Sequence, residues 1–160
     1  MHIGSRRVPS HPAPPVELLG LQADADTAML DCIGDVSNVH ALVLGEHGLE
    51  LMCALIRRGC ATVAVLRLNQ KAEPGTADLV VVPRTASPEV VEQALRQAQR
   101  AMAPNGRIVL RIDNKRASSV ATSVTRLLHE LGFRSIRVRS LPRQTLLSAE
   151  RSSSGAALCH

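Results

Sequence analysis

Ionisable side chains follow the first apolar run of the sequence, in a short turn that contains two glycines. Residues 40–44 read HALVL, the turn after them reads Gly45-Glu46-His47-Gly48, and Glu50 lies two positions further on. A histidine beside carboxylates has the chemistry of a general base. The simpler interpretation is that Glu46 and Glu50 complement the dipole of a following helix and that His47 is a surface residue.

A second set of polar residues follows two later apolar runs. Arg84 comes shortly after DLVVV (residues 78–82), and Asp113 and Asn114 come directly after RIVLRI (residues 107–112). If both runs are parallel strands, these side chains lie at the sheet edge where open α/β folds bind ligands. The alternative is that they serve only as loop and capping residues.

The sequence lacks the motifs of several enzyme and metal-binding classes. It contains no G-x-S-x-G, no P-loop and no H-E-x-x-H, and none of its 4 cysteines forms a C-x-x-C pair. We therefore predict neither a metal site nor a catalytic nucleophile. Phe133 is the only aromatic residue, which counts against base stacking on single-stranded nucleic acid.

Apolar periodicity and turn residues predict strands that alternate with helices. Ser87 and Pro88 are typical of the cap and first position of a helix, and Leu49, Met52, Cys53 and Ile56 recur at helical spacing as an expected apolar face. Helices are expected over about 24–33, 46–58, 88–102 and 117–131. Strands are expected over 40–44, 62–66, 78–82, 107–112, 135–140 and 144–149.

This order of elements predicts an α/β fold of three layers, with helices on both faces of a mostly parallel sheet. The last two strands have no helix between them, so they form a C-terminal antiparallel hairpin. Residues 16–150 are expected to be a single domain, residues 1–15 a flexible arm and residues 151–160 a disordered tail. No signal peptide or bilayer-spanning apolar run is recognisable, and a cytoplasmic location is expected.

Several stretches resemble the class I S-adenosylmethionine-dependent methyltransferase family over about residues 24–150. HALVLGEHGLEL is similar to the family's first strand and glycine loop, GCATVAVLRLN to its second strand and ADLVVV to its fourth. AMAPNGRIVLRI resembles its turn and fifth strand, and LHELGFRSIRVRS its Gly-Phe turn and sixth strand. The resemblance implies S-adenosylmethionine as the cofactor of an active member. It also implies a cofactor site of Gly45, Glu46, His47, Gly48 and Arg67, and a substrate side of Arg84, Asp113 and Asn114.

The sequence departs from the family's pattern at the cofactor site. The family's loop reads G-x-G-x-G, whereas here Gly45 matches the first glycine, His47 replaces the second and Leu49 the third. A shifted count matches Gly45 and Gly48 instead. The family's second strand ends in an acidic residue that accepts hydrogen bonds from both ribose hydroxyls, whereas Leu66 or Arg67 stands here and neither side chain can accept one. About eleven residues separate the second and third expected strands, so the family's own third strand, which contributes adenine contacts, is missing. We therefore expect cofactor binding to be weakened or lost.

These departures predict a degenerate methyltransferase-like domain that works without catalysis as a binding or regulatory module. One alternative is a small S-adenosylmethionine-dependent methyltransferase with an atypical cofactor pose. Another is a nucleic-acid accessory protein, because residues 101–160 carry 10 Lys/Arg against 3 Asp/Glu, including Arg134, Arg137, Arg139 and Arg143. A solvated strand face explains the same arginines. We expect the partner to be a protein, or a second copy that joins through an edge strand or a helix face, since the shortened sheet leaves an edge to be covered.

Overall fold

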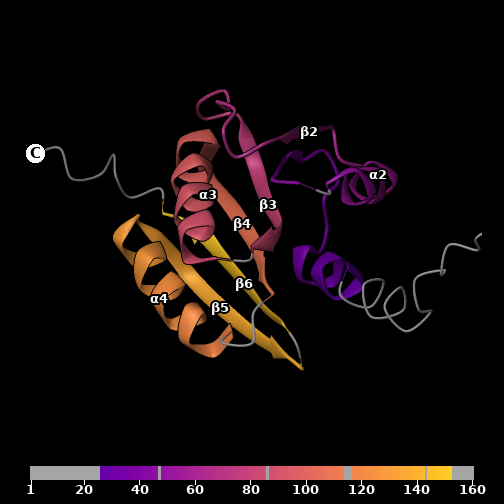
Figure 1. Ribbon diagram of the computed structural model, residues 1–160. Coiled ribbons are helices and arrows are strands. Elements are labelled where there is room, and N and C mark those ends of the chain that lie inside the picture. The colour runs from indigo at the N-terminus through magenta and orange to yellow at the C-terminus, as the bar shows by residue number, and fades with distance from the viewer. Residues whose placement is uncertain (1–25, 47, 86, 114–116, 143, 153–160) are drawn as a thin grey trace, which may run out of the picture.

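The computed structural model describes residues 26–46, 48–85, 87–113, 117–142 and 144–152. The arm expected over residues 1–15 and nearly all of the expected tail lie outside them. A helix over residues 26–33 comes first, and then strands and helices alternate until the last two strands (Figure 1). The elements are β1 (His40–Leu44), α2 (Leu49–Arg57), β2 (Thr62–Leu66), β3 (Ala77–Thr85), α3 (Pro88–Ala101), β4 (Met102–Ile112), α4 (Ala117–Glu130), β5 (Phe133–Leu141) and β6 (Gln144–Arg151).

Within the described residues, six strands form one sheet in the order β2-β1-β3-β4-β6-β5. The strands β2, β1, β3 and β4 run parallel, and β6 pairs antiparallel with both β4 and β5. The expected mostly parallel sheet with a C-terminal antiparallel hairpin is confirmed. The strand β6 runs on to Arg151, one residue into the stretch expected to be a tail.

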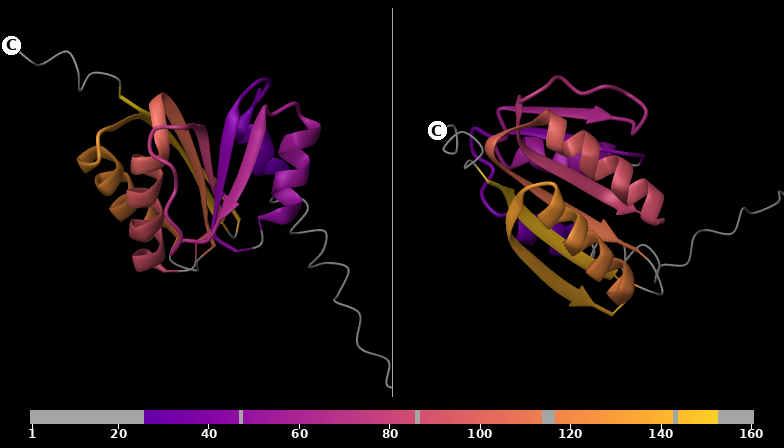
Figure 2. Two further views of the ribbon diagram at one scale, coloured as in Figure 1. Left: turned by 90° about the horizontal axis from the view of Figure 1, so that it is seen from above. Right: turned by 90° about the vertical axis from the view of Figure 1, so that its left-hand side faces the viewer.

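Helices cover both faces of the sheet and create two apolar cores (Figure 2). On one face α3 and α4 pack side by side, with Leu95 and Leu128 among their fully buried side chains. On the other face α2 and the helix over 26–33 bury Leu55 and Met29. The three-layer α/β/α prediction is therefore confirmed, and the central strand β3 is buried on both sides, as parallel strands between two helical layers are.

The helix α3 begins where the sequence predicts it. The hydroxyl oxygen of Ser87 accepts a hydrogen bond from the backbone N–H of Val90 at 3.3 Å, and Pro88 occupies the first helical turn. These residues satisfy one of the free N–H groups and pre-set the backbone for a helix. The start of α3 is thereby fixed beside the end of β3.

The prediction for α2 is wrong in two respects. The helix begins at Leu49, three residues later than expected, and it buries Leu51 and Leu55. Leu49 and Ile56 are 67% and 54% exposed, and Cys53 is exposed as well. Apolar residues occur nearly all round α2, so periodicity alone could not identify the side that contacts the sheet.

A ten-residue connection, 67–76, replaces a longer crossover between β2 and β3. It lies along α3: the side-chain amide of Gln93 donates to the Leu68 carbonyl at 3.3 Å, and that of Gln97 donates to the Gln70 carbonyl. At its end the Gly75 N–H donates to the Arg100 carbonyl at 3.1 Å. In the described part of the chain, β2 pairs only with β1 and forms the sheet edge.

Residues Pro104-Asn105-Gly106 belong to the stretch that resembles the family's turn before its fifth strand, and they lie inside β4, which begins earlier than expected. Ala77 pairs with Met102 and Leu79 with Arg107, so three extra residues of β4 bulge out of the ladder. Asn105 has a φ of 63° at this bulge, a conformation that Asn adopts more readily than most residues. The turn therefore interrupts β4 and does not precede it.

Candidate functional site

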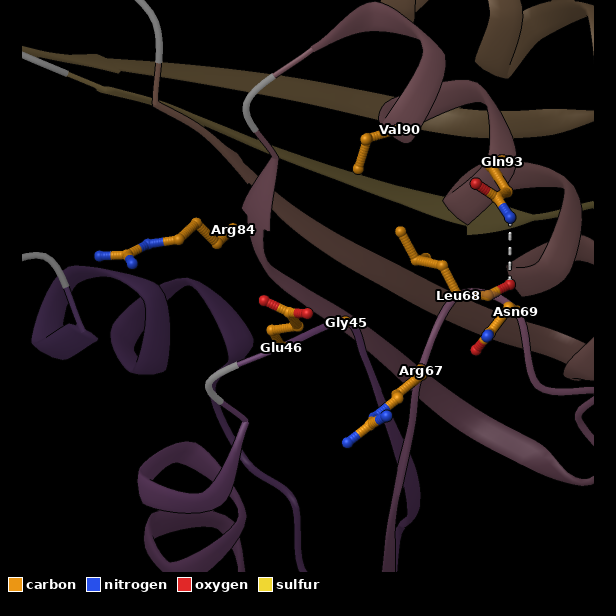
Figure 3. A pocket seen from close by; sticks show the side chains of 8 residues that line it. All are labelled: Gly45, Glu46, Arg67, Leu68, Asn69, Arg84, Val90 and Gln93. Carbon is orange, nitrogen blue, oxygen red and sulfur yellow. Dashed lines mark hydrogen bonds between the residues drawn. The ribbon is translucent and has the colours of Figure 1, made fainter.

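A cavity of about 520 Å³ lies at the carboxyl ends of β1, β2 and β3. The chain leaves β1 toward β2 and then returns to β3 on the other side of β1, and open α/β sheets bind ligands where the strand order reverses in this way. The cavity is within the range of small-molecule sites, roughly 300–1,000 Å³. Its lining residues are Gly45, Glu46, Arg67, Leu68, Asn69, Arg84, Val90 and Gln93 (Figure 3).

The two glycines of the turn after β1 have different roles. Gly45 has a φ of 105°, and its N–H donates to the Leu66 carbonyl at 2.8 Å, which joins the ends of β1 and β2. Gly48 has an ordinary φ of −83°. A Cβ added to it would lie 2.8 Å from Cγ1 of Val43 and 3.2 Å from Cγ1 of Val65. Gly45 therefore shapes the cavity wall, whereas Gly48 allows the turn to pack closely on the sheet.

Arg67 follows the last residue of β2 and lines the cavity. Its backbone N–H donates to Oε1 of Gln70 at 2.9 Å, while its side chain is exposed. Among the residues that the structure describes, no carboxylate lies within ion-pair distance of the Arg67 guanidinium. The group offers hydrogen-bond donors and no acceptor, so it is suited to an anion.

The rest of the cavity wall consists partly of polar and partly of apolar side chains. In the described part of the wall, Glu46 is the only carboxylate, and in the view of Figure 3 it lies between the guanidinium groups of Arg67 and Arg84. Leu68 and Val90 contribute apolar surface. The wall thus carries two positive charges and one negative charge beside an apolar patch.

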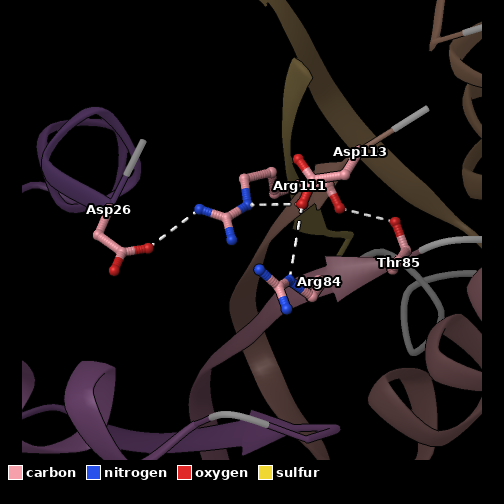
Figure 4. Close-up of polar contacts among 5 residues, drawn as sticks. All are labelled: Asp26, Arg84, Thr85, Arg111 and Asp113. Carbon is pink, nitrogen blue, oxygen red and sulfur yellow. Dashed lines mark hydrogen bonds and ion pairs between the residues drawn. The ribbon is translucent and has the colours of Figure 1, made fainter. Parts of the chain in front are cut away.

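Arg84 and Asp113, both expected on the substrate side, lie together. Nε of Arg84 is 3.9 Å from Oδ2 of Asp113, and the two side chains are 45% and 35% exposed (Figure 4). Asn114 lies outside the described residues. Arg84 also lines the cavity, so its charge is only partly offset by a long, exposed ion pair.

Arg111, which was not among the predicted site residues, completes this cluster. Its side chain is 4% exposed, with Nη1 3.0 Å from Oδ1 of Asp26 and Nε 3.5 Å from Oδ2 of Asp113. The Thr85 hydroxyl donates to the Arg111 carbonyl at 2.6 Å. The available signal was a single charge inside the apolar run IVLRI, because a buried guanidinium needs a carboxylate partner. Through its ion pair with Asp26, Arg111 links the helix over 26–33 to the end of β4.

The arginines expected to form a basic face lie on β5, at the sheet edge opposite β2. Arg134, Arg137 and Arg139 are exposed. Their partners on β6 are Glu150, Ser148 and Leu146, which alternate along that strand and so share one face of the sheet. An irregularity between Arg134 and Arg137 adds one residue to β5, which brings Arg134 to the same face. Arg143 is not among the described residues.

The described residues contain neither a group of metal ligands nor a membrane-spanning helix. No three His, Cys, Asp or Glu side chains are grouped so that they could hold a metal ion. None of the helices in the described part of the chain is long and apolar enough to cross a bilayer.

Solved structures of methyltransferases share this arrangement of helices and strands. The ribosomal protein L11 methylase from Lactobacillus delbrueckii subsp. bulgaricus matches with a TM-score of 0.65 at 13% identity, over 82% of this chain and 79% of that one. An S-adenosylmethionine-dependent methyltransferase from Mesorhizobium loti matches with a TM-score of 0.61 at 14% identity, over 80% and 96%. The chain has the class I methyltransferase-like fold. No protein-family model matches the sequence, and no curated protein is a significant match.

A third methyltransferase-like structure has ligands in place. The 1,6-didemethyltoxoflavin-N1-methyltransferase from Burkholderia thailandensis, with bound 1,6-didemethyltoxoflavin and S-adenosylhomocysteine, matches with a TM-score of 0.60 at 11% identity, over 95% of this chain and 98% of that one. At such identities the likeness concerns the fold alone. Whether this chain binds the same cofactor depends on its own residues.

The expected departures from the methyltransferase cofactor site lie around the cavity. Gly45 keeps the place and the left-handed conformation of a loop glycine. The strand β2 ends at Leu66, Arg67 follows it, and residues 67–76 connect directly to β3 without a further strand. His47 lies outside the described residues. Of the five residues expected to bind cofactor, Gly45, Glu46 and Arg67 line the cavity, and Gly48 is buried against Val43.

Proposed function

We propose that this protein is a non-catalytic binding or regulatory module with a methyltransferase-like fold and a degenerate cofactor site. The observation that carries the proposal is the pair Leu66 and Arg67, the last residue of β2 and the residue after it. Methyltransferases have an acceptor for the ribose hydroxyls of S-adenosylmethionine at this point, and neither of these side chains can accept a hydrogen bond. Among the described lining residues Glu46 is the only carboxylate, and it belongs to the turn after β1.

The free-energy cost of this change is large enough to affect function. A bound hydroxyl left without an acceptor costs about 1–3 kcal/mol. Two such hydroxyls therefore weaken binding by at least about thirtyfold, since each 1.4 kcal/mol is a factor of ten. S-Adenosylmethionine also carries a sulfonium, which makes its net charge positive, and the two guanidinium groups of the wall repel it.

A second candidate, a small methyltransferase with an atypical cofactor pose, is supported by the place of the cavity and by Gly45. Under this candidate Gly45, Glu46, Gly48 and Arg67 hold the cofactor, while Arg84 and Asp113 contact the methyl acceptor. Arg84 and Asp113 lie 3.9 Å apart at the required edge of the sheet. The two candidates differ in the affinity that they require for S-adenosylmethionine.

Calorimetric titration of the full chain with S-adenosylmethionine and S-adenosylhomocysteine tests the proposal. We expect no binding by the wild type at millimolar ligand. The variant Arg67→Asp restores an acceptor at the end of β2 and should bind both compounds measurably. Micromolar binding by the wild type would overturn the proposal and favour the enzyme.

A further inference from the structure

The cavity that lacks a ribose acceptor has the groups that a phosphate needs. We propose that it binds a nucleotide with a phosphate group on the 2′ position of its ribose, and that Arg67 holds this phosphate. The inference rests on the proposed function, because the phosphate would occupy the space of the ribose hydroxyls of S-adenosylmethionine. The inference thus names a ligand class that this site would bind in place of S-adenosylmethionine.

The position of Arg67 in the fold indicates that the bound phosphate is attached to the ribose of the ligand. Arg67 lies 22 residues after Gly45 and directly after β2. In dinucleotide-binding α/β folds an acidic residue at this point accepts hydrogen bonds from ribose hydroxyls, and a nearby arginine accommodates a 2′-phosphate instead. An arginine at this point therefore selects for an added phosphate, since its planar fork binds two phosphate oxygens at once.

The charges of the wall indicate which arginine is available. Arg84 lies 3.9 Å from Asp113, so its charge is partly offset. Arg67 has no such carboxylate among the described residues. The Gly45 N–H donates to the Leu66 carbonyl at 2.8 Å and fixes the backbone one residue before Arg67. A guanidinium on a fixed backbone at the mouth of a cavity is a suitable anion-binding group.

The remaining lining residues fit the nucleoside. Leu68 and Val90 offer apolar surface to a base. The side chain of Asn69 is exposed at the same wall and can donate and accept at a base edge, which is how an amide reads adenine. Gln93 donates to the Leu68 carbonyl at 3.3 Å, so the residue before Asn69 is held against α3. A cavity of about 520 Å³ accommodates a ligand of this size.

Titration of the full chain with four probes tests the inference. The probes are adenosine 2′-monophosphate, adenosine 5′-monophosphate, adenosine and S-adenosylhomocysteine. We expect the 2′-monophosphate to bind at least about tenfold more tightly than adenosine or the 5′-monophosphate, which is the effect of one charge-assisted pair. Raising the salt concentration should reduce this preference.

Two charge-matched variants assign the effect to one residue. Arg67→Gln should abolish the preference for the 2′-monophosphate. Arg126→Gln removes the same charge from the exposed surface of α4, away from the lining residues, and should leave the preference unchanged. Circular dichroism spectra and melting temperatures show that both variants fold. An Arg67→Gln protein that folds and keeps the preference would refute the inference.

The outcomes separate the inference from the proposed function. If none of the four probes binds at millimolar concentration, the inference is wrong and the loss of the S-adenosylmethionine site stands. If adenosine binds as tightly as its 2′-monophosphate, the inference is also wrong, because Arg67 then contributes nothing. If S-adenosylhomocysteine binds at micromolar concentration and the 2′-monophosphate does not, both proposals are overturned.

Discussion

Replacing Gly48 with alanine should destabilise the domain through packing. The new Cβ would lie 2.8 Å from Cγ1 of Val43, whose side chain is fully buried, and 3.2 Å from Cγ1 of Val65. Excess volume in a packed core costs about 1–3 kcal/mol. The φ of −83° at Gly48 suits alanine as well. Alanine lowers the conformational entropy of the unfolded chain, which offsets about 0.4–1 kcal/mol of the packing cost. We expect a net loss of about 1–2 kcal/mol in the free energy of unfolding.

Thermal denaturation followed by circular dichroism measures this loss. For a chain of this length, 1 kcal/mol lowers the melting temperature by about 2–4 °C, so a fall of about 2–8 °C is expected. The decisive variant is the double mutant Gly48→Ala/Val43→Ala, which removes the methyl group that the new Cβ meets. Its loss of stability should be smaller than the sum of the two single losses.

Gly132→Ala provides the control for the backbone. Gly132 has a φ of 87° and nothing within 4 Å of an added Cβ, so its replacement costs stability through backbone strain alone. Val43→Ala should not offset this loss. Strict additivity of Gly48→Ala and Val43→Ala would refute packing as the reason for glycine at position 48.

Four further perturbations address the rest of the molecule. Arg111→Ala should lower the free energy of unfolding by about 2–4 kcal/mol in urea denaturation, because it removes a buried side chain and both of its ion pairs, and leaves Asp26 without its arginine partner, whereas Asp113 keeps Arg84. Arg111→Met, which keeps the volume, should cost less. Burial raises the pKa of the Cys60 thiol, against a smaller opposing effect of the Arg107 guanidinium. Cys60 therefore carries less thiolate than an ordinary cysteine near pH 8, and mass spectrometry should find the exposed Cys53 alkylated by iodoacetamide first. The same raised pKa makes the folded state less stable as the pH rises past about 9, since the unfolded thiol loses its proton first. If the arginines of β5 bind single-stranded nucleic acid, replacing Arg137 and Arg139 by glutamine should reduce the slope of log affinity against log salt by about 1.4. If β2 joins a second copy, sedimentation velocity should detect a concentration-dependent dimer that Ala64→Lys weakens, because a lysine on an edge strand opposes pairing.

Much of the fold follows from local features of the sequence. The strands β1 and β2 have the predicted bounds, and α3 begins at the predicted cap. These elements have clear signals, namely short apolar runs bounded by turn residues and a Ser-Pro pair. The antiparallel hairpin follows from chain connectivity, because three residues cannot make a parallel crossover.

The parts that were not predicted depend on contacts between distant residues. The helix α2 buries Leu51 and Leu55, and the spacing of its apolar residues could not identify that side, because apolar residues occur on most of its surface. The irregularity that aligns Arg134 with Arg137 and Arg139 depends on pairing with β6.

The candidate site was predicted in its position and only partly in its composition. The residues that follow the strands, Gly45, Arg67 and Arg84, line the cavity because parallel strands bring their carboxyl ends together. Leu68, Asn69, Val90 and Gln93 were missed because the path of residues 67–76 along α3 brings them to the same wall. That path depends on hydrogen bonds from glutamine side chains, which have no distinctive sequence signal.

The short connection after β2 also has a kinetic consequence. Glu46, Arg67, Asn69, Arg84 and Gln93 line the cavity and are all exposed, so a ligand can enter without the opening of a covering segment formed by the described residues. In enzymes whose lids close over the substrate, lid opening often limits the rate of product release. As far as the described residues frame the entrance, no such step delays a ligand, so association should be fast and the residence time should follow the affinity. A site of this kind follows changes in the concentration of its ligand with little delay, as a sensor must.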